Sequence, residues 1–599
     1  MKGRTTLALI GLFVLAVLAL GQTTPTTVTI IHTANIYGNV LPFNYFTNTY
    51  EPKGLVQIYS YVNKIRSSGR ELLLVDTGNL LYGSPFGDYF LENPSTDNPV
   101  VAVFNKVDYD VFVPGTLELN LGSVKLSHLK LLKTNVVAIN MAQNLSFVKP
   151  YYVKTFQSGL KVVLIGVVPL YEKVDYINAL RSTLQKVKTE VAPDLIILAT
   201  SGGITYDPIS GKQISLASKF NLGDTLVKQF SNEVDVFLFG NQAMVYTGVN
   251  KQGKVFSLPG GDGASVNQID ITLTRSDKKW KVSKVFIQNV KMESVSPDME
   301  LLSLMQGYEA YVERWLRTPV LRSEITVGFN KYMAILEDSL VTEIVNKAVI
   351  EFTKSQAGIW NIFNPNYEGF VKGDITRRDI YQLVGKTTTV KVLKLTGKEV
   401  KDIIKKSLEM VSFDGSKVLF SSTLINSPWL YDLFENIYYS VWLNNREIKK
   451  IEFAGKPLED RDTLVVSVPS IRTYGQNPIT SGTIISEIEI PVQRIVFDIV
   501  KSVIGGDILE HREDNNRTSE ILLTYTVKPG DTLAQIAYRL GLAKSKEDLP
   551  VAIAELMALN PNIKDPNRIR PGWVFYYSKN YLNLIPPLKE LFEIKKPGH

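Results

Sequence analysis

Five polar turns in the first half of the chain have the form expected of a metal site. Each follows an apolar, β-branched run, and polar turns at the carboxyl ends of strands are where α/β proteins carry their chemistry. The turns read HTANIYGN from residue 32, DTGN from 76, GTLELN from 115, ATSGG from 199 and GNQA from 240. A site for hard or borderline cations needs carboxylates and neutral imidazoles. These turns instead present Asn35, Tyr37 and Asn79, so the chemistry that their shape suggests lacks its usual ligands.

The elements that must position these turns follow an α/β pattern between Val28 and about Val290. The strand candidates are VTIIHT, ELLLVDTG, DVFVPG, NVVAIN, LKVVLIGVV, APDLIILAT and VDVFLFG. Several are apolar almost throughout, as strands covered by helices on both faces are. Between them, GLVQIYSYVNKIRSSG has the three-to-four-residue apolar spacing of an amphipathic helix. The pattern predicts a layered α/β domain.

The N-terminus has the pattern of an export signal. Lys2 and Arg4 precede an apolar run from Leu7 to Gly21, which is short for a membrane span and has the length of a signal-peptide core. We predict a signal peptide over residues 1–21 and export to the periplasm, cell envelope or cell wall. The alternative is an uncleaved N-terminal anchor, which is the only membrane contact that we expect.

Length and composition limit the remaining possibilities. A chain of 599 residues predicts three or four domains. It has no cysteine, which excludes disulfides, lipid attachment through cysteine and thiolate metal sites. The formal charge of +7 is small and lacks the clustered basic face of a nucleic-acid-binding protein, so no nucleic-acid partner is expected.

Beyond the first domain, the sequence divides into further units. A helical pattern with Pro297 near its start and Pro319 after its end predicts a connecting helix over 293–319. A second α/β domain is predicted over 320–505, a polar linker over 506–522 and a compact strand-helix-helix-strand unit over 523–578. The tail, 579–599, has no interpretable pattern.

Taken in order, the turns resemble those of the 5'-nucleotidase and 2',3'-cyclic phosphodiesterase family, the calcineurin-like metallophosphoesterases. The family motifs H-T-N-D-x-H-G, D-x-G-D, G-N-H-E-F-D, G-x-K-V-x-x-I-G, S-H-x-G and G-H-x-H correspond to 32–38, 76–79, 115–120, 159–166, 199–202 and 240–243. KGDITRRDIY and VKVLKLTGKEVKDIIKKSLE resemble the family's C-terminal domain. The resemblance implies a four-layer metallophosphoesterase-like domain over 25–292 and a 5'-nucleotidase C-terminal-like domain over 320–505.

The resemblance also implies two divalent cations, but the ligand positions are replaced. Those positions fall on Asn35, Tyr37, Asn79, Thr116, Thr200, Asn241 and Ala243, and the catalytic histidine falls on Leu117. Replacing Asp by Asn removes negative charge that would offset the cations, while Leu and Ala carry no ligand atom. We therefore expect no metal cofactor and no catalytic residue.

A metal site could be kept in two other ways. Surviving acids such as Asp76 or Glu118 could form another site, although the family pattern gives them a supporting role. The motifs could also be misaligned, yet no H-x-H, D-x-H or His-rich turn occurs elsewhere. His32 lies at a position that is not a ligand in the family, so a structural, hydrogen-bonded role is expected for it.

The nucleotide-binding turns of the family are altered as well. They correspond to the stretches 361–366 and 470–475, which lack the glycines and the arginine of the family's N-x-G-G-I-R turn. Phe363 and Tyr474 remain as aromatic residues that either stack on a ligand or fill a local core.

Residues 525–578 resemble a LysM module, a βααβ fold that binds N-acetylglucosamine-containing glycans such as peptidoglycan. The motifs are YTVKPGDTL from residue 525, NPN from 560 and IRPG from 569. The resemblance implies a glycan groove formed by Gly530, Asp531, Thr532, Leu533, Asn560, Pro561, Asn562 and Ile563. For single residues, helix capping or packing is an equally open interpretation.

These observations predict an exported, cell-wall-associated protein with a catalytically degenerate 5'-nucleotidase-like body and a peptidoglycan-binding LysM. The body would bind or scaffold an unknown ligand or protein. One alternative is an active metal-dependent 5'-nucleotidase of nucleotide catabolism, and a second is a nucleotide-binding protein without chemistry.

Overall fold

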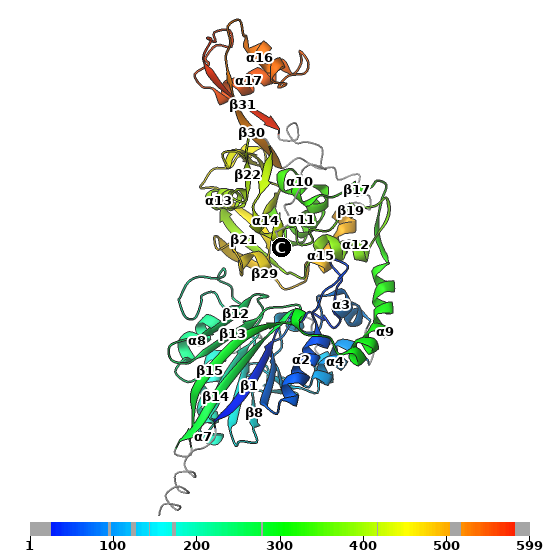
Figure 1. Cartoon of the computed structure of the whole chain (residues 1–599), viewed down its shortest axis with the longest axis vertical. Helices are drawn as coiled ribbons and strands as arrows, with labels where there is room; N and C mark the ends of the chain where they lie inside the picture. Colours follow the sequence, from blue (N-terminus) through cyan, green and yellow to red (C-terminus); the bar gives the residue numbers. More distant parts are fainter. Residues whose placement is uncertain are drawn as a thin grey trace, which may run out of the picture.

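The chain folds into three parts that follow one another along the long axis of the molecule (Figure 1). The computed structural model describes residues 25–93, 97–120, 127–142, 144–169, 175–276, 279–415, 417–503 and 517–580. The predicted signal peptide, most of the predicted linker and nearly all of the tail lie outside these ranges. Within them, no helix is long and apolar enough to cross a membrane.

Two β-sheets form the centre of the N-terminal domain. The first has the strand order β15-β14-β1-β4-β5-β6-β7 and the second β12-β13-β11-β10-β9-β8. Strands β1 (Thr26–Thr33), β4 (Glu71–Asp76) and β5 (Val111–Phe112) are parallel neighbours, as are β9 (Lys161–Val167), β10 (Leu195–Thr200) and β11 (Val236–Phe239). The predicted strands therefore exist, and each group directs its carboxyl ends to one edge of its sheet.

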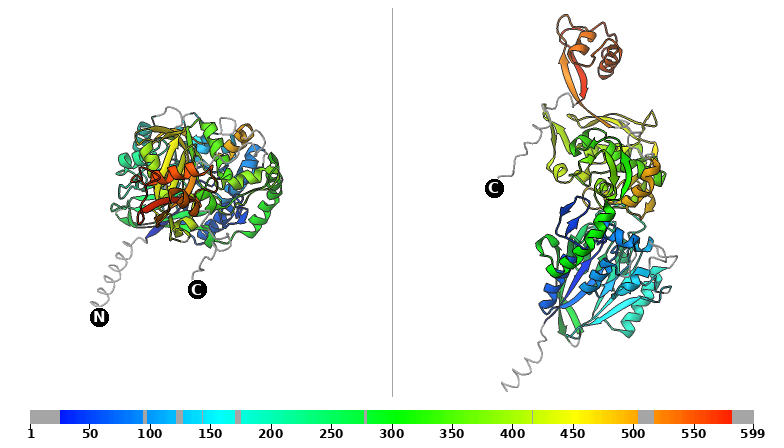
Figure 2. Two further views of the ribbon diagram at one scale, coloured as in Figure 1. Left: turned by 90° about the horizontal axis from the view of Figure 1, so that it is seen from above. Right: turned by 90° about the vertical axis from the view of Figure 1, so that its right-hand side faces the viewer.

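Helices cover the outer faces of both sheets. Alternate side chains of β9 show this, because Val162 packs into the core between the sheets while Val163 packs against α7 (Tyr176–Glu190) and α8 (Gly223–Phe230). Helices α2 (Leu55–Ser67) and α4 (Pro99–Val107) cover the first sheet. This is the predicted four-layer arrangement, visible from the side in Figure 2.

A long helix, α9 (Met299–Leu316), leads to the C-terminal domain along one side of the molecule (Figure 1). That domain has a five-stranded sheet with the order β24-β18-β28-β21-β29. Its strands are β24 (Leu433–Glu435), β18 (Ala357–Trp360), β28 (Thr463–Pro469), β21 (Val390–Thr396) and β29 (Thr483–Ile488). Helices α11 (Leu340–Thr353), α12 (Arg377–Val384), α13 (Gly397–Leu408) and α15 (Val492–Val503) accompany it. The mixed α/β prediction is confirmed.

The third part shares a β-sheet with the second. Strand β30 (Arg517–Thr526) pairs through its first residues with β25 (Tyr438–Trp442) and through the rest with β31 (Val574–Asn580). The prediction of a polar linker over 506–522 is therefore wrong for residues 517–522, which form the strand that joins the two domains. Helices α16 (Leu533–Arg539) and α17 (Leu549–Leu559) complete the predicted βααβ order.

Buried contacts hold β30 against the C-terminal domain. The Arg517 side chain, 1% exposed, donates hydrogen bonds to the carbonyl oxygens of Ala334 and Glu337. The Ser519 hydroxyl donates to the Leu336 carbonyl at 2.5 Å. The terminal module is therefore a continuation of the body and is not held by a flexible tether alone.

Candidate functional site

The five polar turns meet at the carboxyl ends of the parallel strands. Asn35 follows β1, Asn79 follows β4, Thr116 begins the short helix α5 (Thr116–Asn120), Thr200 ends β10 and Asn241 follows β11. The fold therefore brings together the turn residues that the sequence motifs single out.

Asparagine side chains at this meeting point bind one another. Asn79 Nδ2 donates to Asn35 Oδ1 at 2.9 Å, while Asn79 Oδ1 accepts from the Leu117 backbone N–H at 2.9 Å. Asn35 Nδ2 in turn lies 3.2 Å from the carbonyl oxygens of Gln242 and Gly260. Both side chains are at most 1% exposed. The amides thus form a closed hydrogen-bonded chain across the two sheets.

Glu489 of the C-terminal domain completes this arrangement. The Thr116 hydroxyl lies 2.8 Å from Glu489 Oε2 and 2.9 Å from Asn241 Oδ1. Burial raises the pKa of Glu489, against the opposing effects of the Thr116 hydrogen bond and of Lys391. The Thr116 hydroxyl therefore links Asn241 of the second sheet to Glu489 of the C-terminal domain. The sequence does not predict a role for Glu489, because it lies 373 residues from Thr116 and in no motif.

The turns keep an unusual backbone shape. Asn35, Tyr37, Asn79 and Asn241 have φ angles of 55°, 54°, 59° and 61°. Asparagine adopts this left-handed conformation more readily than most residues, whereas an aromatic residue such as Tyr37 adopts it at a cost. Gly78 and Gly115 approach so closely that a Cβ on Gly78 would lie 2.3 Å from the Gly115 nitrogen. The loop geometry is therefore built to hold side chains in fixed positions.

These residues do not fit the two cations that the family resemblance implies. A dinuclear site needs a bridging anion and ligands with free lone pairs, but Asn79 Nδ2 is a donor that faces the side-chain oxygens of Asn35 and Asn241. The remaining space, bordered by Tyr37, Asn79, Leu117, Asn241 and Glu489, has a volume of about 20 Å³. That is room for roughly one water molecule.

The two nearby acids, Glu118 and Asp76, accept hydrogen bonds that hold the turns in shape. Glu118 accepts N–H groups of Asn79, Leu80, Leu81 and Gly115 at 2.7 to 3.1 Å. Asp76 accepts the Thr33 hydroxyl at 2.6 Å and the Gly78 N–H at 2.8 Å. Burial raises the pKa of Asp76 to about 8 and that of Glu118 in the same direction. Both acids hold turns in shape, which weighs against an alternative metal site.

His32 is a structural residue. Its Nδ1 lies 2.8 Å from the Ser257 hydroxyl and its Nε2 2.9 Å from the Thr77 hydroxyl, at 0% exposure. Burial lowers the pKa of His32 to about 3.

This low pKa predicts a neutral His32 throughout the physiological range. In NMR, its ring signals should stay constant from pH 8 to about pH 4.5. The stability linked to neutral His32 is complete above about pH 6.5 and falls by up to about 1.4 kcal/mol per pH unit below it. A ring titration with a midpoint near pH 6.5 would contradict this.

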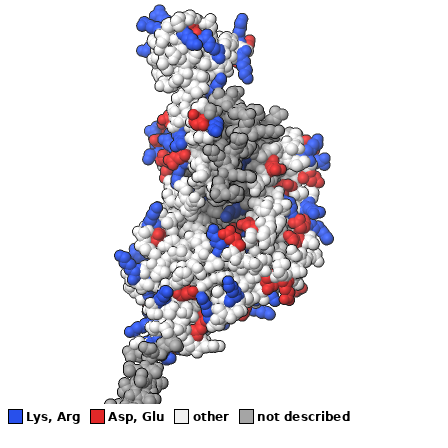
Figure 3. All heavy atoms as spheres, viewed as in Figure 1, with Lys and Arg blue, Asp and Glu red and all other residues white. Residues whose placement is uncertain are grey.

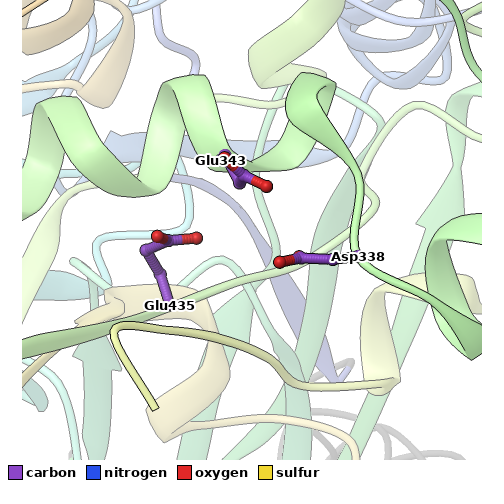
Figure 4. A group of neighbouring side chains, drawn as sticks. All are labelled: Asp338, Glu343 and Glu435. Carbon is purple, nitrogen blue, oxygen red and sulfur yellow. The ribbon is translucent and has the colours of Figure 1, made fainter. Parts of the chain in front are cut away.

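A separate group of acids lies in the C-terminal domain. Carboxylate oxygens of Asp338, Glu343 and Glu435 lie within 4.8 Å of one another, and Figure 4 shows the three side chains converging. Lys347 Nζ lies 2.8 Å from Glu343 and 3.7 Å from Glu435. Lys347 pairs with two of the acids, and the buried Arg517 guanidinium interacts electrostatically with the third, Asp338, so we assign the group a structural role.

A larger cavity, about 360 Å³, lies where the N-terminal and C-terminal domains meet. Its lining includes Phe363, Trp429 and Tyr474, together with Lys386 and Asp262, whose charged atoms are 3.7 Å apart. The Phe363 ring also packs on Trp360 at 5.3 Å between centroids. The two aromatic residues singled out from the sequence thus border one space, and Phe363 fills a local core as well.

The predicted glycan-binding residues fall into two groups. Leu533 and Ile563 are buried, and Asn560 holds the start of β31 through hydrogen bonds with the Tyr576 backbone at 2.7 and 2.8 Å. Asp531 accepts from the Lys528 N–H and from Arg539, and these contacts hold its pKa at about 2. The Thr532 hydroxyl caps α16.

The exposed members form the accessible surface of the predicted groove. They are Gly530, Thr532, Pro561 and Asn562. They lie on the β30–α16 and α17–β31 loops, which meet because the Gly572 N–H donates to the Val527 carbonyl at 2.8 Å.

Comparison with known families gives two matches. The 5'-nucleotidase C-terminal domain matches residues 322–481, and the LysM domain matches residues 525–576. Both matches fall within units that the sequence motifs delimit.

Two curated relatives are nucleotide phosphoesterases. A 2',3'-cyclic-nucleotide 2'-phosphodiesterase/3'-nucleotidase of Salmonella typhimurium is 22% identical over 538 residues, covering 74% of this chain and 81% of that protein. A trifunctional nucleotide phosphoesterase of Bacillus subtilis is 22% identical over 577 residues, covering 81% of this chain but 38% of that protein.

Two solved structures share the fold. A Staphylococcus aureus protein assigned as a 5'-nucleotidase, solved with alpha-ketoglutarate, is 20% identical with a TM-score of 0.57 and covers 82% of this chain and 100% of its own. Haemophilus influenzae NAD nucleotidase is 14% identical with a TM-score of 0.54, covering 83% of this chain and 99% of its own. At these identities the likeness establishes the fold alone.

Proposed function

We propose, from the premise that this chain is a 5'-nucleotidase-family protein with a C-terminal LysM domain, that it is an exported cell-wall protein whose body no longer hydrolyses phosphate esters. The matches to the 5'-nucleotidase C-terminal domain and the LysM domain, together with the curated relatives, confirm the resemblance predicted from the motifs. The curated relatives are named as enzymes, so the loss of activity is a proposal about this chain.

One observation carries this proposal, namely the closed hydrogen-bonded chain that joins Asn79, Asn35 and the neighbouring turns. Hydrolysis in such a site needs cations that clamp the phosphate and activate a water. Here the positions that would hold them carry no carboxylate or imidazole. The Asn79 side chain donates to Asn35, and the Thr116 hydroxyl is hydrogen-bonded to Glu489. The N-terminal domain thus keeps the fold of a hydrolase while its reacting groups are absent.

The LysM domain supports association with peptidoglycan or another N-acetylglucosamine-containing glycan. Export is proposed from the apolar segment between Leu7 and Gly21. Together these features support the proposal that the body is held at the cell wall as a binding or scaffolding module.

A phosphate-release assay tests the loss of activity. AMP and 3'-AMP should release no phosphate, and 2',3'-cyclic AMP should give no ring-opened monophosphate, above the uncatalysed rate with Mn²⁺, Zn²⁺ or Mg²⁺ present. Turnover that a chelator abolishes and Mn²⁺ restores would refute the proposal and support the rival, an active cell-wall nucleotidase.

The cavity between the domains favours a second candidate, a nucleotide-binding protein without chemistry. Its 360 Å³ and the bordering rings of Trp429, Phe363 and Tyr474 suit a flat ring system. Millimolar AMP or adenosine should then raise the melting temperature of the full chain, because a ligand that binds only the folded state stabilises it. Trp429→Ala should abolish the shift. The absence of any shift in the unmodified protein would refute this candidate.

A further inference from the structure

The loops that border the predicted glycan groove carry an excess of positive charge. Three segments converge there, 527–532, 560–564 and 570–573. Val527 pairs with Trp573 through a 2.8 Å hydrogen bond, and Asn560 is bonded to the backbone of Tyr576. Cationic side chains on these segments therefore surround one small surface.

Some of the charge in this region is already balanced. Asp531 pairs with Arg539 at 2.7 Å, and Asp565 pairs with Arg568 at 3.4 Å. Lys528, Lys564 and Arg570 are exposed, and none of them forms an ion pair within the part of the chain that the structure describes. Figure 3 shows Lys and Arg prominent on the visible face of this module.

The position of these three residues links them to the groove. Lys528 precedes the exposed Gly530 by two residues, and Lys564 directly follows Ile563 at the end of the NPN loop. Arg570 lies in the turn that its carbonyl closes with the Trp573 N–H at 3.2 Å. The three cations therefore lie on the same loops as Gly530, Thr532, Pro561 and Asn562, beside a glycan that lies across these residues.

We propose that Lys528, Lys564 and Arg570 make the LysM groove selective for an N-acetylated glycan that carries carboxylates, over a neutral one. This inference rests on the proposed glycan-binding function and names the chemistry of the polymer. A neutral N-acetylglucosamine oligomer offers the groove amides and hydroxyls but no charge. Carboxylates on the peptide substituents of peptidoglycan, or on lactyl groups that carry no peptide, would meet the three cations beside the groove.

The test measures binding of the full chain to purified peptidoglycan before and after its carboxylates are converted to amides, and to a chitin hexamer. Each peptidoglycan sample is measured before and after acid treatment, which removes phosphate-bearing wall polymers. Native peptidoglycan should bind about tenfold more tightly than the amidated form, since each exposed charge contact is worth a few-fold in affinity. Added salt should remove the difference.

The triple variant Lys528→Gln, Lys564→Gln, Arg570→Gln should bind native and amidated peptidoglycan equally and keep its affinity for the chitin hexamer. A matched control changes Lys544, Lys546 and Lys579 to Gln. Lys544 and Lys546 lie in the α16–α17 loop, at the far ends of both helices, and Lys579 lies at the far end of β31. This control should retain the preference.

Four outcomes overturn the inference. If the unmodified chain binds native and amidated peptidoglycan equally, it has no preference for charge. If the control variant loses the preference for native peptidoglycan, net charge alone determines that preference. A preference that disappears when phosphate-bearing polymers are removed assigns the charge to phosphate. Failure to bind any of the three glycans refutes the glycan-binding function itself.

Discussion

Replacing Asn79 with aspartate should destabilise the protein by about 2–4 kcal/mol, the expected cost of a buried carboxyl that faces acceptors. Asn79 Nδ2 donates to Asn35 Oδ1 at 2.9 Å and lies 3.5 Å from Asn241 Oδ1. In the Asn79→Asp variant an oxygen would take the place of this donor. The change restores the acid that the family motif has at this position. If the protein bound metal here, its stability would therefore stay the same or rise.

Two measurements make this prediction specific. The introduced carboxyl can donate to Asn35 only when protonated, so its pKa should rise on folding and the loss of stability should grow as the pH rises above about 4. Denaturant unfolding at pH 5 and pH 8 measures that difference. Added Mn²⁺ should not restore stability, because the other ligand positions stay neutral; restoration by Mn²⁺ would contradict the account.

Asn250→Asp is the matched control. The Asn250 side-chain oxygen accepts the N–H groups of Gln252 and Lys254 at 3.0 and 2.9 Å, and a carboxylate accepts both as well. The control should change stability by no more than about 0.5 kcal/mol.

Replacing Arg517 with methionine should destabilise the C-terminal domain by about 3–5 kcal/mol, the usual range when one partner of a buried charged contact is lost. The guanidinium donates to the carbonyl oxygens of Ala334 and Glu337, and methionine supplies no donor. The first residues of β30, which pair with β25, depend on the same contact.

Unfolding of the full chain, followed by near-ultraviolet circular dichroism, measures this effect. Arg568→Met is the control, since the Arg568 side chain is 86% exposed and its removal should cost less than about 1 kcal/mol. If Arg517→Met left the unfolding of the C-terminal domain unchanged, the LysM module would be tethered to the body and not built into its sheet.

Much of the fold follows from local sequence patterns. The run VTIIHT lies within β1, and ELLLVD forms β4, because apolar β-branched segments between polar turns have few other stable arrangements. The two LysM helices follow from the Thr532 cap and the NPN stop in the same way. The meeting of the polar turns was also predictable, since parallel strands place their carboxyl ends together.

The closure of the site was not predictable, because it depends on contacts between distant segments. Glu489 reaches Thr116 across the domain boundary, and Gln493 donates to the Gly83 carbonyl at 2.8 Å. Strand β30 was missed for a related reason. Arg517, Thr518, Ser519 and Glu520 are polar, and only tertiary structure shows that Arg517 is buried and hydrogen-bonded.

The metal content of the purified full chain tests the central claim most directly. The protein would be incubated with excess Mn²⁺ and Zn²⁺, dialysed, and analysed for bound metal per chain. None of the seven family ligand positions carries a carboxylate or an imidazole, and the side chains of Asn35 and Asn79 are hydrogen-bonded to each other. These positions predict less than about 0.1 ion per chain, since even the loss of a supporting partner typically costs 10- to 100-fold in affinity. Two tightly bound ions per chain, lost together when Asn35 and Asn79 are changed to alanine, would contradict the account.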